Sequence, residues 1–371
     1  MDFFNTQTDD KNSEIKWDEN LSALAKKKIQ IKYFDSNLQE HLYRPYSKAW
    51  LYFSTQLNQR VYQWPSIYSK QEENYIIGIP GLGSSKPFQI LSSKYIIGLD
   101  TIEKTQCLPL YRYENEERTN NITDWALEQF MKQYATNEKW EQISKEFVEY
   151  DQSKYPPDVL TPASVFHSIE KEEIFYYVYA VLHNPAYRKK YELNLKREFP
   201  RIPFYKNFYQ WVKWGEQLMN LHINYETAEP YPLNVIARRN DEAISDSKID
   251  NEIALSQPNT KPKAPCNDER MPKAKLKALK DIGVIVLDDN TELHGIPPSA
   301  WDYKLGNRSA LEWILDQYKE KKPTDPTIAE KFNTYKFADY KQHVIDLLKK
   351  VCTVSVETMK VVREMEGVPT S

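Results

Sequence analysis

Glycine is scarce in this chain: 9 of 371 residues are glycine, against 26 tyrosines and 9 tryptophans. Phosphate and nucleotide sites use glycine where the backbone must approach a ligand closely. The one glycine cluster is GIPGLGSSK at 78–86. Its Lys86 comes two positions late for a phosphate-binding loop, and residues 89–97 resemble a strand, not the helix expected after a methyl-donor loop. We therefore predict a hairpin turn at 78–86, with a cofactor loop as the weaker interpretation.

The tetrapeptide NPAY at 184–187 nearly spells Asn-Pro-Pro-Tyr, the catalytic loop of amino-group DNA methyltransferases. In that loop the asparagine and the aromatic ring hold a flipped base. Such a loop follows a strand, whereas residues 172–183 carry apolar side chains at helical spacing and the charged run after Tyr187 is again helical. We interpret Asn184 as the end of one helix and Pro185 as the start of the next. A catalytic loop is the alternative.

Composition excludes several classes of protein. A net charge of −3 rules out a uniformly basic nucleic-acid binder, so an anionic partner must be met by local patches. Cys107, Cys266 and Cys352 lie too far apart for a zinc ribbon or a disulfide framework and fit a reducing cytoplasm. The chain has no run of about twenty apolar residues and no signal-peptide pattern. Its six histidines are scattered singly, so we assign no catalytic, cofactor-binding or metal-binding residue.

Periodicity predicts a mixed α+β chain with a small β-rich N-terminal region, a mainly helical region, and a C-terminal β-hairpin with helices. Particular expectations are a strand at 29–33, helices within 124–150 and 162–222 that include a Thr161-Pro162 start, and a hairpin of 284–287 with 291–296. Three C-terminal helices are expected at 308–320, 339–351 and 355–366. The predicted regions are a loose N-terminus at 1–20, a β-rich region at 21–115, a helical region at 120–233, a low-complexity insertion at 234–270, and the hairpin with helices at 271–371.

Basic and aromatic residues alternate between Arg188 and Lys213, where eight basic residues face only Glu192 and Glu198. Lysine and arginine neutralise phosphates, and arginine also binds guanine edges. A solvated helix face over an aromatic core is an equally good interpretation of the residue types. A second basic stretch, 261–280, is most simply a flexible linker. Arg308 precedes a helix start, where it could approach a phosphate or pair with Glu312 four residues on.

Five stretches together resemble the C-terminal part of type ISP restriction-modification enzymes, which join nuclease, helicase-like ATPase, adenine-N6 methyltransferase and target-recognition domains. These stretches are LYRPYSKAWLYFS (42–54), CLPLYRY (107–113), YVYAVLHNPAYRKKYELNLKREFPRIPF (177–204), GIPPSAWDYKLGNRSALEWILDQY (295–318) and TVSVETMKVV (353–362). The resemblance covers about 21–365, with an interruption near 234–270. Met1 corresponds to a point deep inside the family's sequence, and NPAY matches a helical stretch downstream of the family's catalytic loop.

The resemblance implies a DNA specificity module that directs methylation and cleavage by catalytic domains absent from this chain. S-adenosylmethionine, ATP and Mg²⁺ are then expected only in those domains. The implied partners are double-stranded DNA and, less directly, a methyltransferase/helicase polypeptide, with no membrane. Two alternatives stay open: an active adenine methyltransferase that uses 184–187 and the Gly81-x-Gly83 turn, or a decayed remnant. The residues expected to contact DNA are Arg188, Lys189, Lys190, Arg197, Arg201, Lys206, Arg44 and Arg308.

Overall fold

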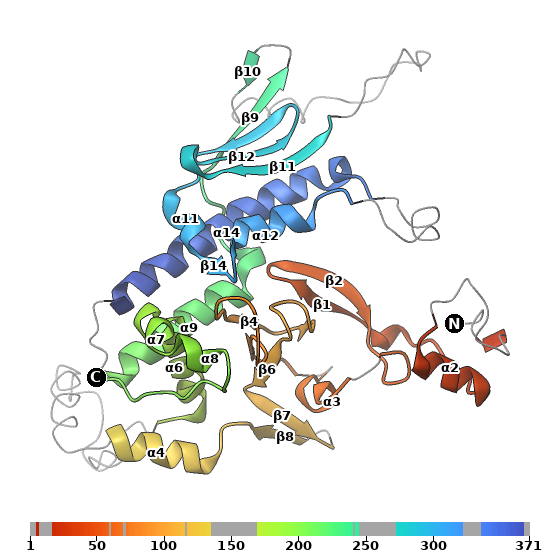
Figure 1. The fold of residues 1–371 in the computed structure, drawn as a ribbon, viewed down its shortest axis with the longest axis vertical. Helices are drawn as coiled ribbons and strands as arrows, with labels where there is room; N and C mark the ends of the chain where they lie inside the picture. The colour runs from red at the N-terminus through yellow and green to blue at the C-terminus, as the bar shows by residue number, and fades with distance from the viewer. Residues whose placement is uncertain are drawn as a thin grey trace, which may run out of the picture. The chain divides into compact units, whose positions relative to one another are not determined.

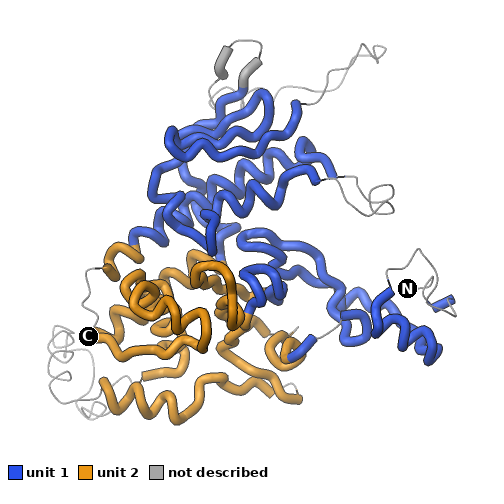
Figure 2. The backbone as a smooth tube through the Cα atoms, viewed as in Figure 1, with its two compact units in different colours: residues 1–62, 96–105, 224–360 blue, residues 63–95, 106–223, 361–371 orange. Residues whose placement is uncertain are grey.

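The computed structural model describes residues 5–6, 17–58, 61–69, 72–115, 117–134, 169–239, 242–244, 272–321 and 335–366. Helices and several small sheets form a mixed α+β fold, which confirms the predicted class (Figure 1). The chain divides into two compact units (Figure 2). Unit 1 holds Met1–Tyr62, Ile96–Thr105 and Asn224–Lys360, and unit 2 holds Gln63–Tyr95, Gln106–Ile223 and Val361–Ser371. Outside the described residues lie the expected Thr161-Pro162 helix start, the 135–150 part of the helices expected within 124–150, and residues 245–271.

Unit 1 begins with a helix and a small sheet. Helix α2 (Glu19–Lys26) is capped by Asp18 and is followed by the 3₁₀ turn η1 (Asp35–Asn37). Strands β1 (Leu38–Arg44) and β2 (Ser47–Tyr52) form an antiparallel hairpin, and the short β5 (Ile96–Ile97) pairs with β1 in parallel. The strand expected at 29–33 is wrong. The Asn5 carboxamide bonds the backbone N–H and C=O of Ile31, so these groups have no strand partner.

A five-stranded antiparallel sheet in unit 1 has the order β10-β9-β13-β12-β11. The predicted hairpin of β12 (Val284–Asp288) and β13 (Thr291–His294) is confirmed. Strand β9 (Asn234–Arg239) pairs with β13 and β10 (Glu242–Ile244) pairs with β9, so the expected insertion at 234–270 in fact begins inside a sheet. Likewise β11 (Ala274–Leu279) pairs with β12, so this part of the 261–280 stretch is not a linker. Among the described residues near this sheet, 3₁₀ turns are found at η3 (Tyr225–Thr227) and η5 (Lys280–Ile282).

The C-terminal part contains α11 (Pro298–Asp302), the two-stranded β14 (Lys304–Leu305) and β15 (Arg308–Ser309), α12 (Ala310–Gln317) and α14 (Phe337–Glu366). The two last helices predicted from sequence are one helix of 30 residues. Val354 and Ser355 lie at the expected break but are fully buried, and the Ser355 hydroxyl donates to the Val351 carbonyl one turn earlier. Burial outweighs the weak helix propensity of these residues. Among the described residues, no helix is both long and apolar enough to cross a membrane.

Unit 2 combines small antiparallel strands with a packed pair of helices. Strand β3 (Ile76–Ile79) lies between β4 (Leu91–Ser93) and β6 (Gln106–Pro109), which confirms the predicted hairpin across the glycine cluster. The remaining elements are α3 (Trp64–Ile67), the hairpin of β7 (Tyr111–Glu114) and β8 (Glu117–Asn120), α4 (Asp124–Tyr134), α6 (Lys171–His183), α7 (Pro185–Lys190), α8 (Glu192–Leu195) and α9 (Phe208–Ile223).

The core of unit 2 lies between α6 and α9. Tyr177 and Tyr179 of α6 are fully buried with Trp211 and Leu218 of α9. The two helices approach so closely at Gly215 that a Cβ added there would lie 1.8 Å from the Tyr176 carbonyl oxygen. This core fixes the end of α6 and hence the start of the basic region that follows it.

Candidate nucleic-acid interface

Asn184 joins the buried helix α6 to the basic region. Its backbone N–H bonds the Val181 carbonyl at the end of α6, and its side-chain oxygen accepts from the N–H groups of Ala186 and Tyr187 at 2.8 and 3.3 Å. Pro185 occupies the first position of α7. The predicted helix stop and restart is therefore confirmed. Because Asn184 is fully buried and its oxygen caps α7, that oxygen is not exposed to accept a hydrogen bond from a base.

We define the basic segment as residues 185–206, which comprise α7, α8 and the loop after them. Buried residues hold it in place: Tyr187 is 1% exposed and its hydroxyl donates to the Arg201 carbonyl at 2.9 Å. The Gly83 N–H donates to the Lys196 carbonyl at 2.9 Å, so the glycine turn after β3 also braces the segment. Five of the predicted DNA-contacting residues lie exposed on it: Lys189, Lys190, Arg197, Arg201 and Lys206.

Arg188, the sixth predicted residue of this run, points inward. Its Nε donates to the Leu182 carbonyl at 2.6 Å, and its guanidinium lies 5.8 Å from the centre of the Phe88 ring. The bond satisfies a carbonyl in the last turn of α6, where intrahelical donors run out. Arg188 therefore supports the end of α6 and is less suited than its neighbours to contact a phosphate.

Two histidines that are 39 positions apart in sequence meet beside Arg188. The rings of His183 and His222 lie 5.3 Å apart, and the Tyr179 hydroxyl bonds His222 Nδ1. Burial, together with the Arg188 charge, lowers the pKa of His222 to about 3 and that of His183 well below its usual range. Both rings are therefore neutral near pH 7. Sequence spacing gave no sign of this pair, because α6 and α9 bring it together only on folding.

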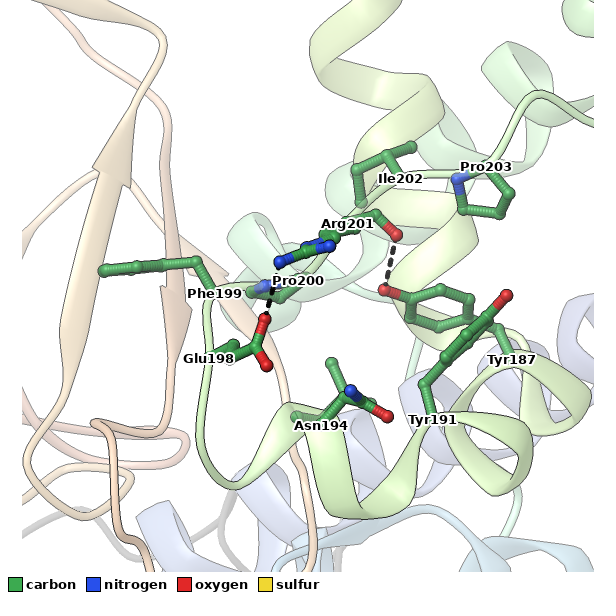
Figure 3. A pocket seen from close by; sticks show the side chains of 10 residues that line it. Tyr187, Tyr191, Asn194, Glu198, Phe199, Pro200, Arg201, Ile202 and Pro203 are labelled. Carbon is green, nitrogen blue, oxygen red and sulfur yellow. Dashed lines mark hydrogen bonds and ion pairs between the residues drawn. The ribbon is translucent and has the colours of Figure 1, made fainter.

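A pocket of about 300 Å³ lies within the basic segment. Figure 3 shows the rings of Tyr187 and Tyr191 on one side and the Glu198 and Arg201 side chains across from them. Arg201 Nη2 lies 2.9 Å from Glu198 Oε2, and the Arg201 side chain is 90% exposed. The arginine is thus tethered at both its carbonyl and its guanidinium while it faces solvent.

Arg44 and Arg308, the other two predicted residues, belong to unit 1, whereas the basic segment belongs to unit 2. Arg44 Nη1 donates to the carbonyls of Tyr43 and Asp100 at 3.0 Å each, and its guanidinium lies over the Tyr43 ring. It is half-buried at the end of β1. These bonds order the hairpin and leave only part of the guanidinium to a ligand.

Arg308 pairs with Asp316 at 3.0 Å and lies over the Trp313 ring. The pairing with Glu312 that was one of the two interpretations of Arg308 is wrong: the Glu312 carboxylate accepts from Ser309 in a capping box and pairs with Lys280 at 2.8 Å. The i, i+4 rule holds along one helix, but Arg308 lies in strand β15 before α12 begins. In the described part of the chain, no group of three or more His, Cys, Asp or Glu side chains could hold a metal ion.

Comparisons with known proteins give one consistent result. The family model described as "Type ISP C-terminal specificity domain" matches residues 2–347. Among solved structures, the chain is similar to the DrdV–DNA complex solved by cryo-EM, with 43% identity and a TM-score of 0.78 over 97% of this chain. It is also similar to a nuclease-deletion mutant of the type ISP restriction-modification enzyme LlaGI in complex with a DNA substrate mimic, with 25% identity and a TM-score of 0.64 over 96% of this chain.

The ATP-dependent type ISP restriction-modification enzyme LlaBIII bound to DNA shares the fold, with 20% identity and a TM-score of 0.70 over the full length of this chain. The chain spans only 31%, 27% and 21% of the DrdV, LlaGI and LlaBIII chains. No curated protein matches the sequence.

Proposed function

Because this chain belongs to the family of type ISP C-terminal specificity domains, we propose that it recognises a DNA sequence for a type ISP restriction-modification system. In this proposal it directs adenine-N6 methylation and cleavage by catalytic domains outside this chain. This chain spans at most 31% of any of the three similar solved chains, so each of them has room for further domains. S-adenosylmethionine, ATP and Mg²⁺ are accordingly assigned to those domains.

The observation that carries the proposal is the set of exposed cations on the basic segment. Lys189, Arg197 and Lys206 form no ion pair or hydrogen bond through their side chains with another described residue. The whole chain carries a net charge of −3, so attraction to DNA must come from such a local patch. Contacts of lysine and arginine with phosphates release counterions, and affinity then falls with salt by roughly 0.9 logarithmic units per contact and per tenfold increase in salt.

Partners and location follow from the same proposal. Double-stranded DNA is the ligand, and a polypeptide that carries the methyltransferase and helicase activities is the protein partner. We place the protein in the cytoplasm. Its described cysteines, Cys107 and Cys352, are free thiols, and burial raises the pKa of each to about 12, which keeps them protonated and unreactive.

A charge-reversal pair tests the proposal. In Lys189→Glu/Arg197→Glu, both changed side chains are exposed and Arg188 stays intact, so the fold should be preserved. We expect the affinity for duplex DNA, measured by fluorescence anisotropy at 0.1 M salt, to fall by at least about tenfold, and the salt slope to become shallower by roughly two contacts.

The matched control is Lys27→Glu/Lys32→Glu, which changes the net charge by the same amount at two exposed lysines outside the basic segment. This control should bind duplex DNA within about twofold of the unchanged chain, because neither lysine is one of the proposed phosphate contacts. Equal losses in the two variants would mean that the segment is not the contact surface. No binding by the unchanged chain would refute the proposed function.

A further inference from the structure

Glu198 is an unexpected residue in a segment that should attract phosphates. It lies beside Pro200 and Arg201 in the loop after α8, with its side chain 48% exposed. A carboxylate at this place repels the DNA backbone and partly neutralises the arginine that it contacts. A residue that weakens phosphate attraction needs another physical reason to be there.

Stability is a weak reason. The Glu198–Arg201 pair is exposed and three residues apart in a loop, and exposed ion pairs contribute little to stability because solvent screens them. A second exposed pair, Glu192–Lys196 at 2.9 Å, lies in the same segment and shows what an ordinary helical ion pair looks like here. The backbone carbonyls of Lys196 and Arg201 both accept a hydrogen bond, so the two pairs differ in the cation itself. Lys196 carries a compact ammonium on a flexible stem, whereas Arg201 carries a planar guanidinium.

The backbone around Arg201 is restrained by one hydrogen bond and two nearby prolines. Its carbonyl accepts from the buried Tyr187 hydroxyl, and Pro200 and Pro203 restrict the chain before and after it. Its guanidinium is held by Glu198 yet remains 90% exposed. An arginine whose backbone and side chain are both restrained loses less conformational entropy when it binds a directional partner. A phosphate, which attracts a cation from many directions, gains little from this restraint.

The geometry points to a base edge, and we propose that Arg201 reads a guanine in the major groove and that Glu198 positions its guanidinium. Arginine donates two hydrogen bonds to guanine O6 and N7 from a planar fork, and this fork still has free N–H groups after Nη2 has bonded Glu198. The carboxylate lowers the attraction of Arg201 for the sequence-independent backbone, which favours discrimination between bases. This inference rests on the proposed function and adds the base class and a positioning residue.

Selection of bound sequences from a random duplex pool, at one stated salt concentration, tests the inference on the full chain. The unchanged chain should select a site with a guanine at a fixed position. Arg201→Lys keeps the charge but not the fork, so we expect discrimination for that guanine to fall by roughly 5- to 100-fold while preferences at other positions and the salt slope stay unchanged. Glu198→Gln should weaken the same preference in part. Glu192→Gln, which breaks the ordinary pair, should leave every position unchanged.

Each other outcome is decisive. If Arg201→Lys selects the same site with the same preference for guanine, or if the selected site contains no guanine, the inference is overturned while the proposed function stands. If Arg201→Ala weakens binding equally to all sequences and lowers the salt slope by about one, Arg201 is a phosphate contact and the inference again fails. If the unchanged chain enriches no sequence at all, the proposed function itself fails. Thermal unfolding of each variant checks that the fold is kept, which the exposure of both side chains favours.

Discussion

The α6–α9 helix pair and the basic segment belong to the same unit, and each is rich in aromatic residues. The two regions place these residues differently. In the helix pair the rings of Tyr177 and Trp211 are buried and make the core. In the basic segment, Tyr187 is buried as an anchor while Lys189 and Arg197 face solvent. The sequence suggested two competing interpretations of residues 188–213, an aromatic core or a DNA-contacting surface. The structure makes them compatible, because the rings of Tyr205, Phe208 and Trp211 are buried while most of the cations are exposed.

The comparison implies that stability and DNA affinity can be changed separately. Substitutions between α6 and α9 should change the free energy of unfolding and leave the contact surface of the folded protein intact. Substitutions of exposed cations should do the reverse. The largest change in stability is expected from a substitution at the point where α6 and α9 are in closest contact.

Gly215→Ala should have the largest effect. Alanine is favoured over glycine within a helix by about 1 kcal/mol, so propensity alone predicts stabilisation. The added Cβ, however, would lie 1.8 Å from the Tyr176 carbonyl oxygen, which is a backbone atom that cannot simply rotate away. We expect a loss of about 3 kcal/mol in the free energy of unfolding, measured by urea denaturation.

Gly83→Ala is the matched control in the same unit. A Cβ at Gly83 meets no atom within 4 Å, and only its positive φ of 73° opposes the substitution. This strain costs about 1–2 kcal/mol. If Gly215→Ala unfolds at the same urea concentration as the unchanged chain, the close α6–α9 contact is wrong.

Acidification should have the next largest effect, and it should act on the core alone. His222 has a pKa of about 3 when folded, below the usual value of about 6.5 that it regains on unfolding. The unfolded state therefore binds the proton first, and stability is lost as pH falls from about 6.5 toward 3. Between pH 7 and pH 5 this one residue should cost about 2 kcal/mol.

Urea denaturation of the unchanged chain and of His222→Gln at both pH values measures this contribution. Glutamine keeps a hydrogen-bond partner for the Tyr179 hydroxyl but does not titrate, so the variant should show a smaller loss on acidification. Lysine and arginine keep their charges over this range, and DNA affinity of the folded protein should not follow the same curve. An equal loss of stability in the variant would show that His222 is not the group that titrates.

Local signals predicted part of this unit well. The Asn184-Pro185 junction, the hairpin around Gly83 and the amphipathic α4 each depend on residues that are neighbours in sequence, so spacing and turn chemistry suffice to find them. The run of exposed cations is visible for the same reason. The α12 start was also foreseeable, although Arg308 took Asp316 as its partner in place of Glu312.

Contacts between distant residues were not predictable in this way. The His183–His222 pair depends on the packing of α6 against α9, and the inward position of Arg188 depends on its contact with the distant Phe88. The continuous α14 depends on burial of Val354 and Ser355, whose own propensities favour a break. Pairing of β9 with β13 joins strands more than fifty residues apart in sequence, so the start of the predicted insertion could not be recognised as sheet.

Asn184 lies at the boundary of the two regions, and its substitution should have the smallest effect on stability. Asn184→Ala removes the acceptor for two N–H groups at the start of α7, and loss of such a cap costs about 1 kcal/mol. Asn184→Ser keeps a capping oxygen and should recover most of this loss. The Asn184 amide nitrogen has no hydrogen-bond partner in the described part of the chain, so serine gives up no donor that was in use there.

The same two variants separate a cap from a catalytic residue. If Asn184 only caps α7, calorimetry should detect no S-adenosylmethionine binding that depends on it, and both variants should keep their affinity for duplex DNA. Heat of binding in the unchanged chain that disappears in Asn184→Ala would instead favour the methyltransferase alternative. Because the capping oxygen is buried and already accepts two hydrogen bonds, we expect the first result. Asn184 then has a structural role, since it connects the buried helix α6 to the basic segment.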